Sequence, residues 1–222
     1  MKALVIGGCG FIGSHVVDQL LARNIDVRVF GRRPEAFRAP LPQVDYVTGD
    51  LADTSRIFEA LSGVDAVIHL ASTTVPATSN LDPVADITGN LIATVHLLEV
   101  MRSAGVRKII YLSSGGTVYG VPETFPIAES HPLRPISSYG IVKVAIENYL
   151  FMEQRLHLVS GLLADCGAWA IHFSNQRRPY WRSRWHFNYF DIGLILLANL
   201  LQIVSHRYRY GVAVAFAVFF ID

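Results

Sequence analysis

The chain has 222 residues, of which 51% are hydrophobic and 17% charged, and its net charge is +1. This composition excludes a disordered or collagen-like chain, and the balanced charge gives no general attraction to nucleic acid or to an anionic membrane. Two cysteines exclude a disulfide scaffold and a four-cysteine zinc site, and we expect no metal. The first apolar run, residues 3–6, ends at glycines instead of forming a signal peptide, so we expect a cytoplasmic protein.

Short apolar runs alternate with longer helical patterns over the first 156 residues. The runs typical of buried strands are 2–6, 26–30, 44–48, 65–70 and 107–112. The segments with helical patterns are 11–23, 54–62, 83–104 and 136–155. Because parallel strands need long crossover connections, this alternation predicts a doubly wound parallel α/β sheet.

A glycine-rich turn joins the first predicted strand to the first predicted helix. Glycine stands at every third position, Gly7, Gly10 and Gly13, in the segment Gly-Gly-Cys-Gly-Phe-Ile-Gly. Such glycines permit a tight turn, a close approach of the backbone to a pyrophosphate and close packing of helix on strand. The free N–H groups at the start of the helix favour the same phosphates. The turn therefore predicts dinucleotide binding by a Rossmann-type domain, although a glycine turn without a ligand has the same sequence.

The end of the second predicted strand bears on the choice of dinucleotide. An acid that binds the ribose hydroxyls is expected there, but this strand ends in Gly31, followed by Arg32 and Arg33. The two arginines either face the 2′-phosphate of NADP or are solvated loop residues. NAD and NADP therefore both stay open.

Tyr139 and Lys143 form a Tyr-x-x-x-Lys pair in the last predicted helix. Four residues span about one helical turn, so both side chains lie on one face. A free tyrosine has a pKa near 10, which a neighbouring ammonium would lower, making the phenol a usable acid and base. The pair alone is weak evidence, because Tyr and Lys occur at this spacing on many helices. Its position, after a serine-bearing fifth strand, gives it weight.

The order of these motifs resembles the extended short-chain dehydrogenase/reductase superfamily. Residues 113–120, Ser-Ser-Gly-Gly-Thr-Val-Tyr-Gly, resemble the signature of nucleotide-sugar epimerases and dehydratases. The resemblance covers residues 1 to about 157 and is closest to the UDP-glucose 4-epimerase-like group of NAD-dependent epimerases/dehydratases. It implies a bound NAD, a nucleotide-sugar substrate and transient oxidation of a sugar carbon, with Tyr139 taking the hydroxyl proton.

The same resemblance implies further site residues. Asn90 would support the active-site geometry, and a serine or threonine hydroxyl would bind the reacting sugar oxygen. The usual hydroxyl position falls on Gly115, so Ser114 or Thr117 would have to serve. Related enzymes commonly dimerise through two helices, here 83–104 and 136–155. The remaining implied cofactor contacts are Phe11, Ile12, Asp50, Leu51, Leu70, Ala71 and Ser72.

Two of the residues near these strand ends also have simpler interpretations. Asp50 could bind the adenine, cap the helix that begins near Thr54, or do both. His69, at the end of the fourth strand, is more typical of a core or strand-edge histidine than of a catalyst.

Residues 157–222 do not fit the pattern. No lysine follows Lys143 and no glutamate follows Glu153, whereas all three tryptophans lie beyond residue 168. The strand ending in Arg and the Asn/Thr-x-Tyr-Gly-Pro-like segment of the resembling family are missing. We expect an out-of-frame translation beginning near residue 157, with a divergent small domain or a membrane-associated tail as alternatives.

Three functions remain in view. The main expectation is a nucleotide-sugar epimerase whose turnover is weak or absent because the substrate domain is lost. The alternatives are a catalytically silent dinucleotide-binding protein and an NADPH-dependent carbonyl reductase, which Arg32 and Arg33 would favour.

Overall fold

The computed structural model describes residues 1–33, 37–123, 127–128, 130–156, 160–165 and 213–215. In this part of the chain, seven strands form one sheet in the order β3-β2-β1-β4-β5-β6-β7, and every pair is parallel. The strands are β1 (Lys2–Ile6), β2 (Asp26–Gly31), β3 (Val44–Thr48), β4 (Ala66–His69), β5 (Lys108–Ser113), β6 (Ser160–Asp165) and β7 (Ala213–Ala215). The predicted parallel sheet is confirmed, including its first five strands.

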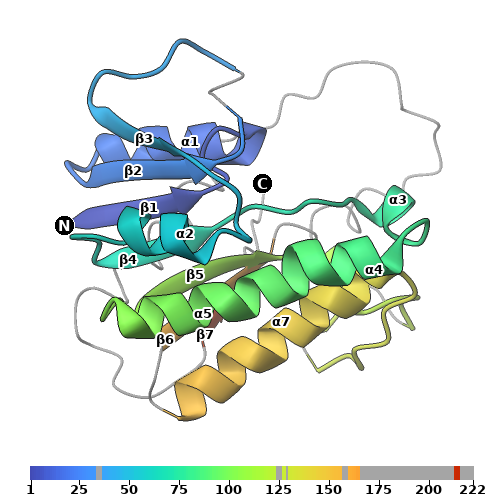
Figure 1. Cartoon of the computed structure of the whole chain (residues 1–222). Coiled ribbons are helices and arrows are strands. Elements are labelled where there is room, and N and C mark those ends of the chain that lie inside the picture. The colour runs from blue at the N-terminus through green and yellow to red at the C-terminus, as the bar shows by residue number, and fades with distance from the viewer. Residues whose placement is uncertain (34–36, 124–126, 129, 157–159, 166–212, 216–222) are drawn as a thin grey trace, which may run out of the picture.

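Helices lie on both faces of the sheet (Figure 1). They are α1 (Phe11–Leu21), α2 (Thr54–Ala60), α3 (Pro76–Ser79), α4 (Pro83–Asp86), the π-helical segment η1 (Ile87–Ile92), α5 (Ala93–Ser103), α6 (Gly115–Val118) and α7 (Ser138–Arg155). The four predicted helices are present, and the short α3 and α6 are additions that the sequence pattern did not reveal.

Successive side chains of β1 point alternately into two hydrophobic cores, one on each face of the sheet. Ala3 and Val5 pack with residues of α1 on one face, whereas Leu4 and Ile6 pack with residues of α2, α5 and α7 on the other. Successive side chains of a strand point to opposite faces, so a strand buried on both sides is apolar throughout. The doubly wound arrangement follows from this pattern.

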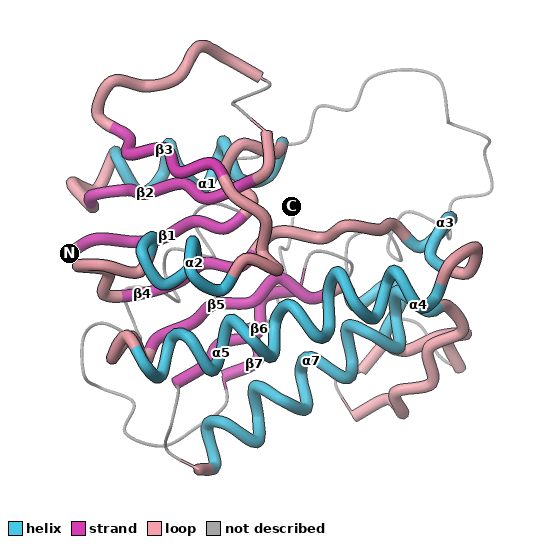
Figure 2. Tube along the Cα trace, viewed as in Figure 1, coloured by secondary structure: helices cyan, strands magenta, loops and turns pink. Residues whose placement is uncertain are grey.

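Helices α4, η1 and α5 form one continuous helix that lies beside α7 (Figure 2). The helix Pro83–Ser103 is long and apolar enough to cross a membrane by length and composition. Leu97, Leu98 and Met101 are nevertheless buried in the core between α2, α7 and the sheet. These contacts account for part of its apolar character, whereas Val84, Ile87 and Ile92 are exposed.

The sheet order reverses at β1, which has β2 on one side and β4 on the other. Ligands of open α/β sheets bind at the carboxyl ends of the strands beside such a reversal. The glycine turn follows β1, and residues 70–72 follow β4. The fold therefore brings two predicted cofactor segments together.

Strand β6 lies beyond residue 156, where the sequence analysis ended the first domain. It pairs with β5 from Lys108↔Ser160 to Ser113↔Asp165, and β7 pairs with β6 in turn. The sheet thus includes residues of the predicted tail, and the strand after α7 ends in Asp165 where the resembling family has Arg. The division at 156 and the three alternatives for residues 157–222 stay predictions, and residues 157–159, 166–212 and 216–222 lie outside the described residues.

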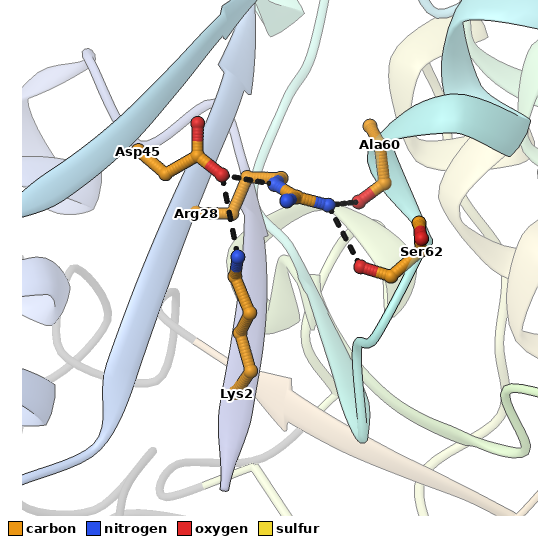
Figure 3. Close-up of polar contacts among 5 residues, drawn as sticks. All are labelled: Lys2, Arg28, Asp45, Ala60 and Ser62. Atoms are coloured by element: carbon orange, nitrogen blue, oxygen red, sulfur yellow. Dashed lines mark hydrogen bonds and ion pairs between the residues drawn. The ribbon is translucent and has the colours of Figure 1, made fainter.

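Arg28, in the middle of β2, links this strand to β3 and to the end of α2 (Figure 3). Its Nε donates to Asp45 Oδ2 of β3 at 2.6 Å, and its Nη1 donates to the carbonyl oxygens of Ala60 and Ser62 at 2.7 and 2.9 Å. Lys2 Nζ lies 3.3 Å from the same Asp45 oxygen. The Arg28 guanidinium, helped by Lys2, lowers the pKa of Asp45.

Candidate active site

The glycine turn is shaped by close approach of main chains. Gly7 has φ +85°, and a Cβ there would lie 2.9 Å from the amide nitrogen of Ala71. A Cβ on Gly13 would lie 2.6 Å from Gly8 Cα. Gly10 precedes the first turn of α1, and no acid lies in that turn. The turn thus presents main-chain N–H groups and the positive end of a helix, which fit the phosphates of a dinucleotide.

Two predicted contacts flank this turn on α1. Phe11 is exposed and its ring lies 5.6 Å from that of Phe37, whereas Ile12 packs against the core. A small exposed aromatic surface therefore lies at the entrance to the glycine turn.

The end of β2 is open. A Cβ on Gly31 would meet no atom within 4 Å, so an acid could be accommodated there. Arg32 is exposed, and no hydrogen bond or ion pair engages it in the described part of the chain. Its guanidinium is therefore available to an anion.

Asp50 and Leu51 follow β3. Asp50 Oδ1 accepts from the Ala52 amide at 2.9 Å, whereas the cap of α2 is Asp53, which accepts from the Arg56 amide. The interpretation of Asp50 as the cap of this helix is therefore wrong. Leu51 packs against the core.

Residues 70–72 continue β4 toward the glycine turn. The Leu70 amide donates to the Ile6 carbonyl at 2.9 Å, and the Ala71 amide is the group that excludes a side chain at Gly7. Ser72 is exposed and its hydroxyl donates to the Thr74 carbonyl. These three residues line the same strand ends as the turn.

Tyr139 and Lys143 lie one turn apart near the start of α7. Lys143 is buried, and its ammonium donates to the Leu112 carbonyl of β5 at 2.9 Å. The same nitrogen lies 5.4 Å from the centroid of the Tyr139 ring and 4.6 Å from that of Tyr111. The predicted pair is thus brought together at the carboxyl end of β5, at the same end of the strands as residues 70–72, which follow β4.

Two buried side chains, Tyr111 and His69, lie close to the Lys143 ammonium, and both are uncharged near neutral pH. Burial, together with the negative charges that Tyr139, Glu147 and Asp86 can carry, raises the pKa of Tyr111 well above its usual value. Burial, and to a lesser extent the charge of Lys143, lowers the pKa of His69 to about 3. Tyr111 therefore keeps its proton near neutral pH.

Asn90 lies in the middle of η1 and is buried. Its Oδ1 accepts from the Thr73 amide at 2.8 Å, and its Nδ2 donates to Asp86 Oδ1 at 2.8 Å and to Thr74 Oγ1 at 3.3 Å. Asn90 therefore holds the loop that follows residues 70–72.

The structure separates the two candidate hydroxyls. Thr117 Oγ1 donates its proton to the Ser114 carbonyl at 3.0 Å. Ser114 lies at the amino end of α6 and its hydroxyl caps no amide of that helix. Of the two, the Ser114 hydroxyl is therefore the better placed to bind another group, because it makes no capping hydrogen bond.

The profile of the NAD dependent epimerase/dehydratase family matches residues 3–163. The chain belongs to this family. It is 37% identical to the UDP-glucose 4-epimerase of Streptococcus mutans over 166 residues, which are 71% of this chain and 48% of that protein. It also resembles the solved UDP-glucose 4-epimerases of Thermus thermophilus with NAD (TM-score 0.69, 36% identity) and of Thermotoga maritima with UDP-glucose (TM-score 0.70, 32% identity). Both structural matches cover 74% of this chain, and 54% and 55% of those chains.

The match confirms the predicted family and Rossmann-type fold of this epimerase/dehydratase chain, and with them the expectation of an NAD-dependent enzyme family. The chain spans about half the length of the curated relatives it matches.

Sequence reasoning missed two acids of this epimerase/dehydratase chain. Asp86 is completely buried and accepts from Thr74 and Ser138, besides Asn90. Glu147 lies one turn after Lys143 and accepts from the Ser113 hydroxyl. The position of Glu147, four residues after Lys143 on one face of a predicted helix, was a signal in the sequence. Among the described residues, no group of three or more His, Cys, Asp or Glu could hold a metal ion.

Proposed function

We propose that this chain binds NAD and exchanges a proton with a nucleotide sugar, in the manner of a UDP-glucose 4-epimerase. The observation that carries the proposal is the Lys143 ammonium, anchored on the Leu112 carbonyl and facing the Tyr139 ring. A cytoplasmic location stays part of this proposal.

The glycine turn and the start of α1 would hold the pyrophosphate of the dinucleotide. Asp50 and Leu51 would contact the adenine, residues 70–72 would lie along the dinucleotide, and Lys143 would hold the nicotinamide ribose. When bound, NAD supplies an acceptor that can take a hydride from a sugar carbon and give it back.

Tyr139 would take the proton from the sugar hydroxyl and later return it. The positive charge of Lys143 attracts the negative charge left on the phenol oxygen, and burial of Lys143 strengthens this attraction. We assign the hydroxyl that binds the reacting sugar oxygen to Ser114, because Thr117 donates its proton to a main-chain carbonyl.

A homodimer through helices 83–104 and 136–155 is part of the proposal. Both helices expose apolar side chains in this structure, which a partner helix would cover. They include Val84, Ile87, Ile92, Ile141 and Tyr149. Light scattering on the purified chain tests this, with Ile141→Glu expected to give a monomer and Phe58→Glu, at an exposed apolar position of α2 outside both helices, as the control.

The experiment that tests the function measures binding and turnover separately. Binding of NAD to the purified chain is followed by calorimetry, and interconversion of UDP-glucose and UDP-galactose by chromatography. Interconversion that Tyr139→Phe abolishes while NAD still binds supports the proposal. Binding without interconversion supports the silent dinucleotide-binding alternative, and absence of binding overturns both.

An NADPH-dependent carbonyl reductase is a second candidate, favoured by the open Gly31 position and the unengaged Arg32. A reductase consumes one cofactor for each product, whereas an epimerase consumes none. Loss of NADPH absorbance with small carbonyl compounds therefore distinguishes the two.

A further inference from the structure

Asp86 is a buried carboxylate at the junction of three segments. It ends α4, and none of its surface is exposed. Its Oδ1 accepts from Thr74 Oγ1 at 2.6 Å and from Asn90 Nδ2 at 2.8 Å, and its Oδ2 is bonded to Ser138 Oγ at 2.7 Å. The three partners come from the loop after β4, from η1 and from the first residue of α7.

The directions of these hydrogen bonds mark Asp86 as an acceptor. The Thr74 hydroxyl and Asn90 Nδ2 both donate to Asp86 Oδ1, and the Ser138 hydroxyl donates to Asp86 Oδ2. No lysine, arginine or histidine forms an ion pair with Asp86 among the described residues. The donors and the positive end of α7, at Ser138, instead compensate the buried charge.

On one side, the Asp86 junction contacts the loop after β4, which lies beside the glycine turn. Asn90 Oδ1 holds the Thr73 amide at 2.8 Å, and Thr74 is bonded to Asp86 directly. Thr73 follows residues 70–72, of which Ala71 abuts Gly7. The Thr73 amide therefore reports on the loop beside the glycine turn.

On its other side, the Asp86 junction reaches the start of α7, next to Tyr139. Ser138 immediately precedes Tyr139, and its amide donates to Asn80 Oδ1 at 2.7 Å. The Tyr139 amide donates to Ser79 Oγ at 3.1 Å. The start of α7 is thus held by side chains from the same stretch that carries Asp86.

We propose that Asp86 is a positioning residue that ties the loop beside the glycine turn to the start of the tyrosine helix. By joining Thr74 to Ser138, it fixes Tyr139 relative to the segment that lies along the dinucleotide. A misplacement of about 1 Å in such a geometry can lower a rate on the order of 100-fold. The effect of Asp86 on catalysis rests on the proposed function. The link that Asp86 makes between Thr74 and Ser138, called the tie below, does not.

Two adjacent serines provide a matched test. Ser138 contacts Asp86, whereas Ser137 caps α7 by accepting from the Gly140 amide at 3.2 Å. Hydrogen exchange followed by NMR on the purified full chain compares Ser138→Ala with Ser137→Ala, reading the amides of positions 73, 138 and 139. Both changes remove one hydroxyl from the start of the same helix.

We expect Ser138→Ala to speed exchange at position 73 as well as at 138 and 139, by about tenfold. Ser137→Ala should speed exchange at the helix start alone, and amides of β1 should be unchanged in both. Equal effects of the two variants at position 73, or a uniform increase over the whole chain, overturn the proposal.

Asp86→Asn is a second, nearly isosteric test. It should speed exchange at both ends of the tie, and a change confined to one end overturns the proposal. Neither experiment needs turnover, so a chain that shows the paired effect but epimerises nothing retains the tie and refutes only the proposed function.

Discussion

Lys143 and Leu112 are joined by a 2.9 Å hydrogen bond from the ammonium to a main-chain carbonyl, which fixes the tyrosine helix to the end of β5. Lys143→Met keeps the length of the side chain but removes the charge. We expect NAD to bind about 10- to 100-fold more weakly, since hydrogen bonds to charged groups contribute about 1.5–3 kcal/mol. Titration calorimetry measures the affinity.

Lys108→Met, at the opposite end of β5, serves as the control, because Lys108 lies at the amino end of that strand. It should leave NAD affinity unchanged. Equal losses in the two variants would show that general charge, and not the anchored ammonium, governs binding.

Gly31→Asp should shift cofactor preference toward NAD. The position has open space for a side chain, and a carboxylate there would accept from the ribose hydroxyls and repel a 2′-phosphate. We expect the ratio of NADP to NAD affinity to fall by about tenfold or more, which corresponds to about 1.4 kcal/mol. Competition binding with both dinucleotides measures it.

The matched control adds a charge at the opposite, amino end of the neighbouring strand. Gln43→Glu does so just before β3, where the side chain is exposed. If it changes the ratio as much as Gly31→Asp, the effect is one of net charge alone.

His69 should make the protein lose stability on acidification. Its pKa is about 3 in the folded chain and about 6.5 when unfolded, so the unfolded chain binds the extra proton between these values. The contribution of His69 to the free energy of unfolding should therefore be complete above pH 6.5 and decrease as the pH drops below that value. Urea unfolding at a series of pH values measures this slope.

His69→Gln is the variant that isolates this effect. Thr94 Oγ1 donates to the Asn90 carbonyl at 2.6 Å, so it must accept from His69 Nε2 at 3.0 Å. Glutamine can keep that donor and does not titrate. A slope between pH 4.5 and 6.5 that persists unchanged in the variant would assign it to other groups.

Arg28 should matter more for stability than its partner Asp45. Arg28→Met breaks the bonds to the Ala60 and Ser62 carbonyls as well as the ion pair, and we expect a loss of about 1–3 kcal/mol. Asp45→Asn should cost less than about 1 kcal/mol, because the carboxylate is 45% exposed and screened.

The pH dependence of this pair follows from the lowered pKa of Asp45. Its contribution is present above the unfolded value of about 4 and is lost as the pH falls through the lower folded value. Chemical unfolding at pH 7 and pH 3 should show a smaller difference between wild type and Asp45→Asn at pH 3. A constant difference would contradict the assignment.

Local patterns were enough to predict the parts of the site that depend on steric needs or on helical spacing. Gly7 and Gly13 are required where main chains touch, so their spacing is visible in the sequence. Tyr139 and Lys143 share a helix face because they are four residues apart. Such relations need no knowledge of the tertiary fold.

The contacts of Asp86 could not be predicted in the same way. Its partner Ser138 is 52 positions away, and the register that joins them depends on the packing of α7 beside α4 and η1. In the sequence, Asp86 is one polar residue in an amphipathic helix, where a solvated position is the ordinary interpretation. The identity of the α2 cap, Asp53 rather than Asp50, likewise depends on the conformation of a turn.

The wide turn at Ile87–Ile92 holds one residue that a regular helix would not need. A π-helical turn contains about one residue more than an α-helical turn, so each of its residues turns the chain through less than the roughly 100° of an α-helix. Deleting exposed Thr88 would therefore leave a regular helix in which Asp86 keeps nearly the same direction relative to α5. A deletion at exposed Glu99, inside the regular α5, has no wide turn to compensate for it and should rotate the two ends of the helix by about 100° relative to each other.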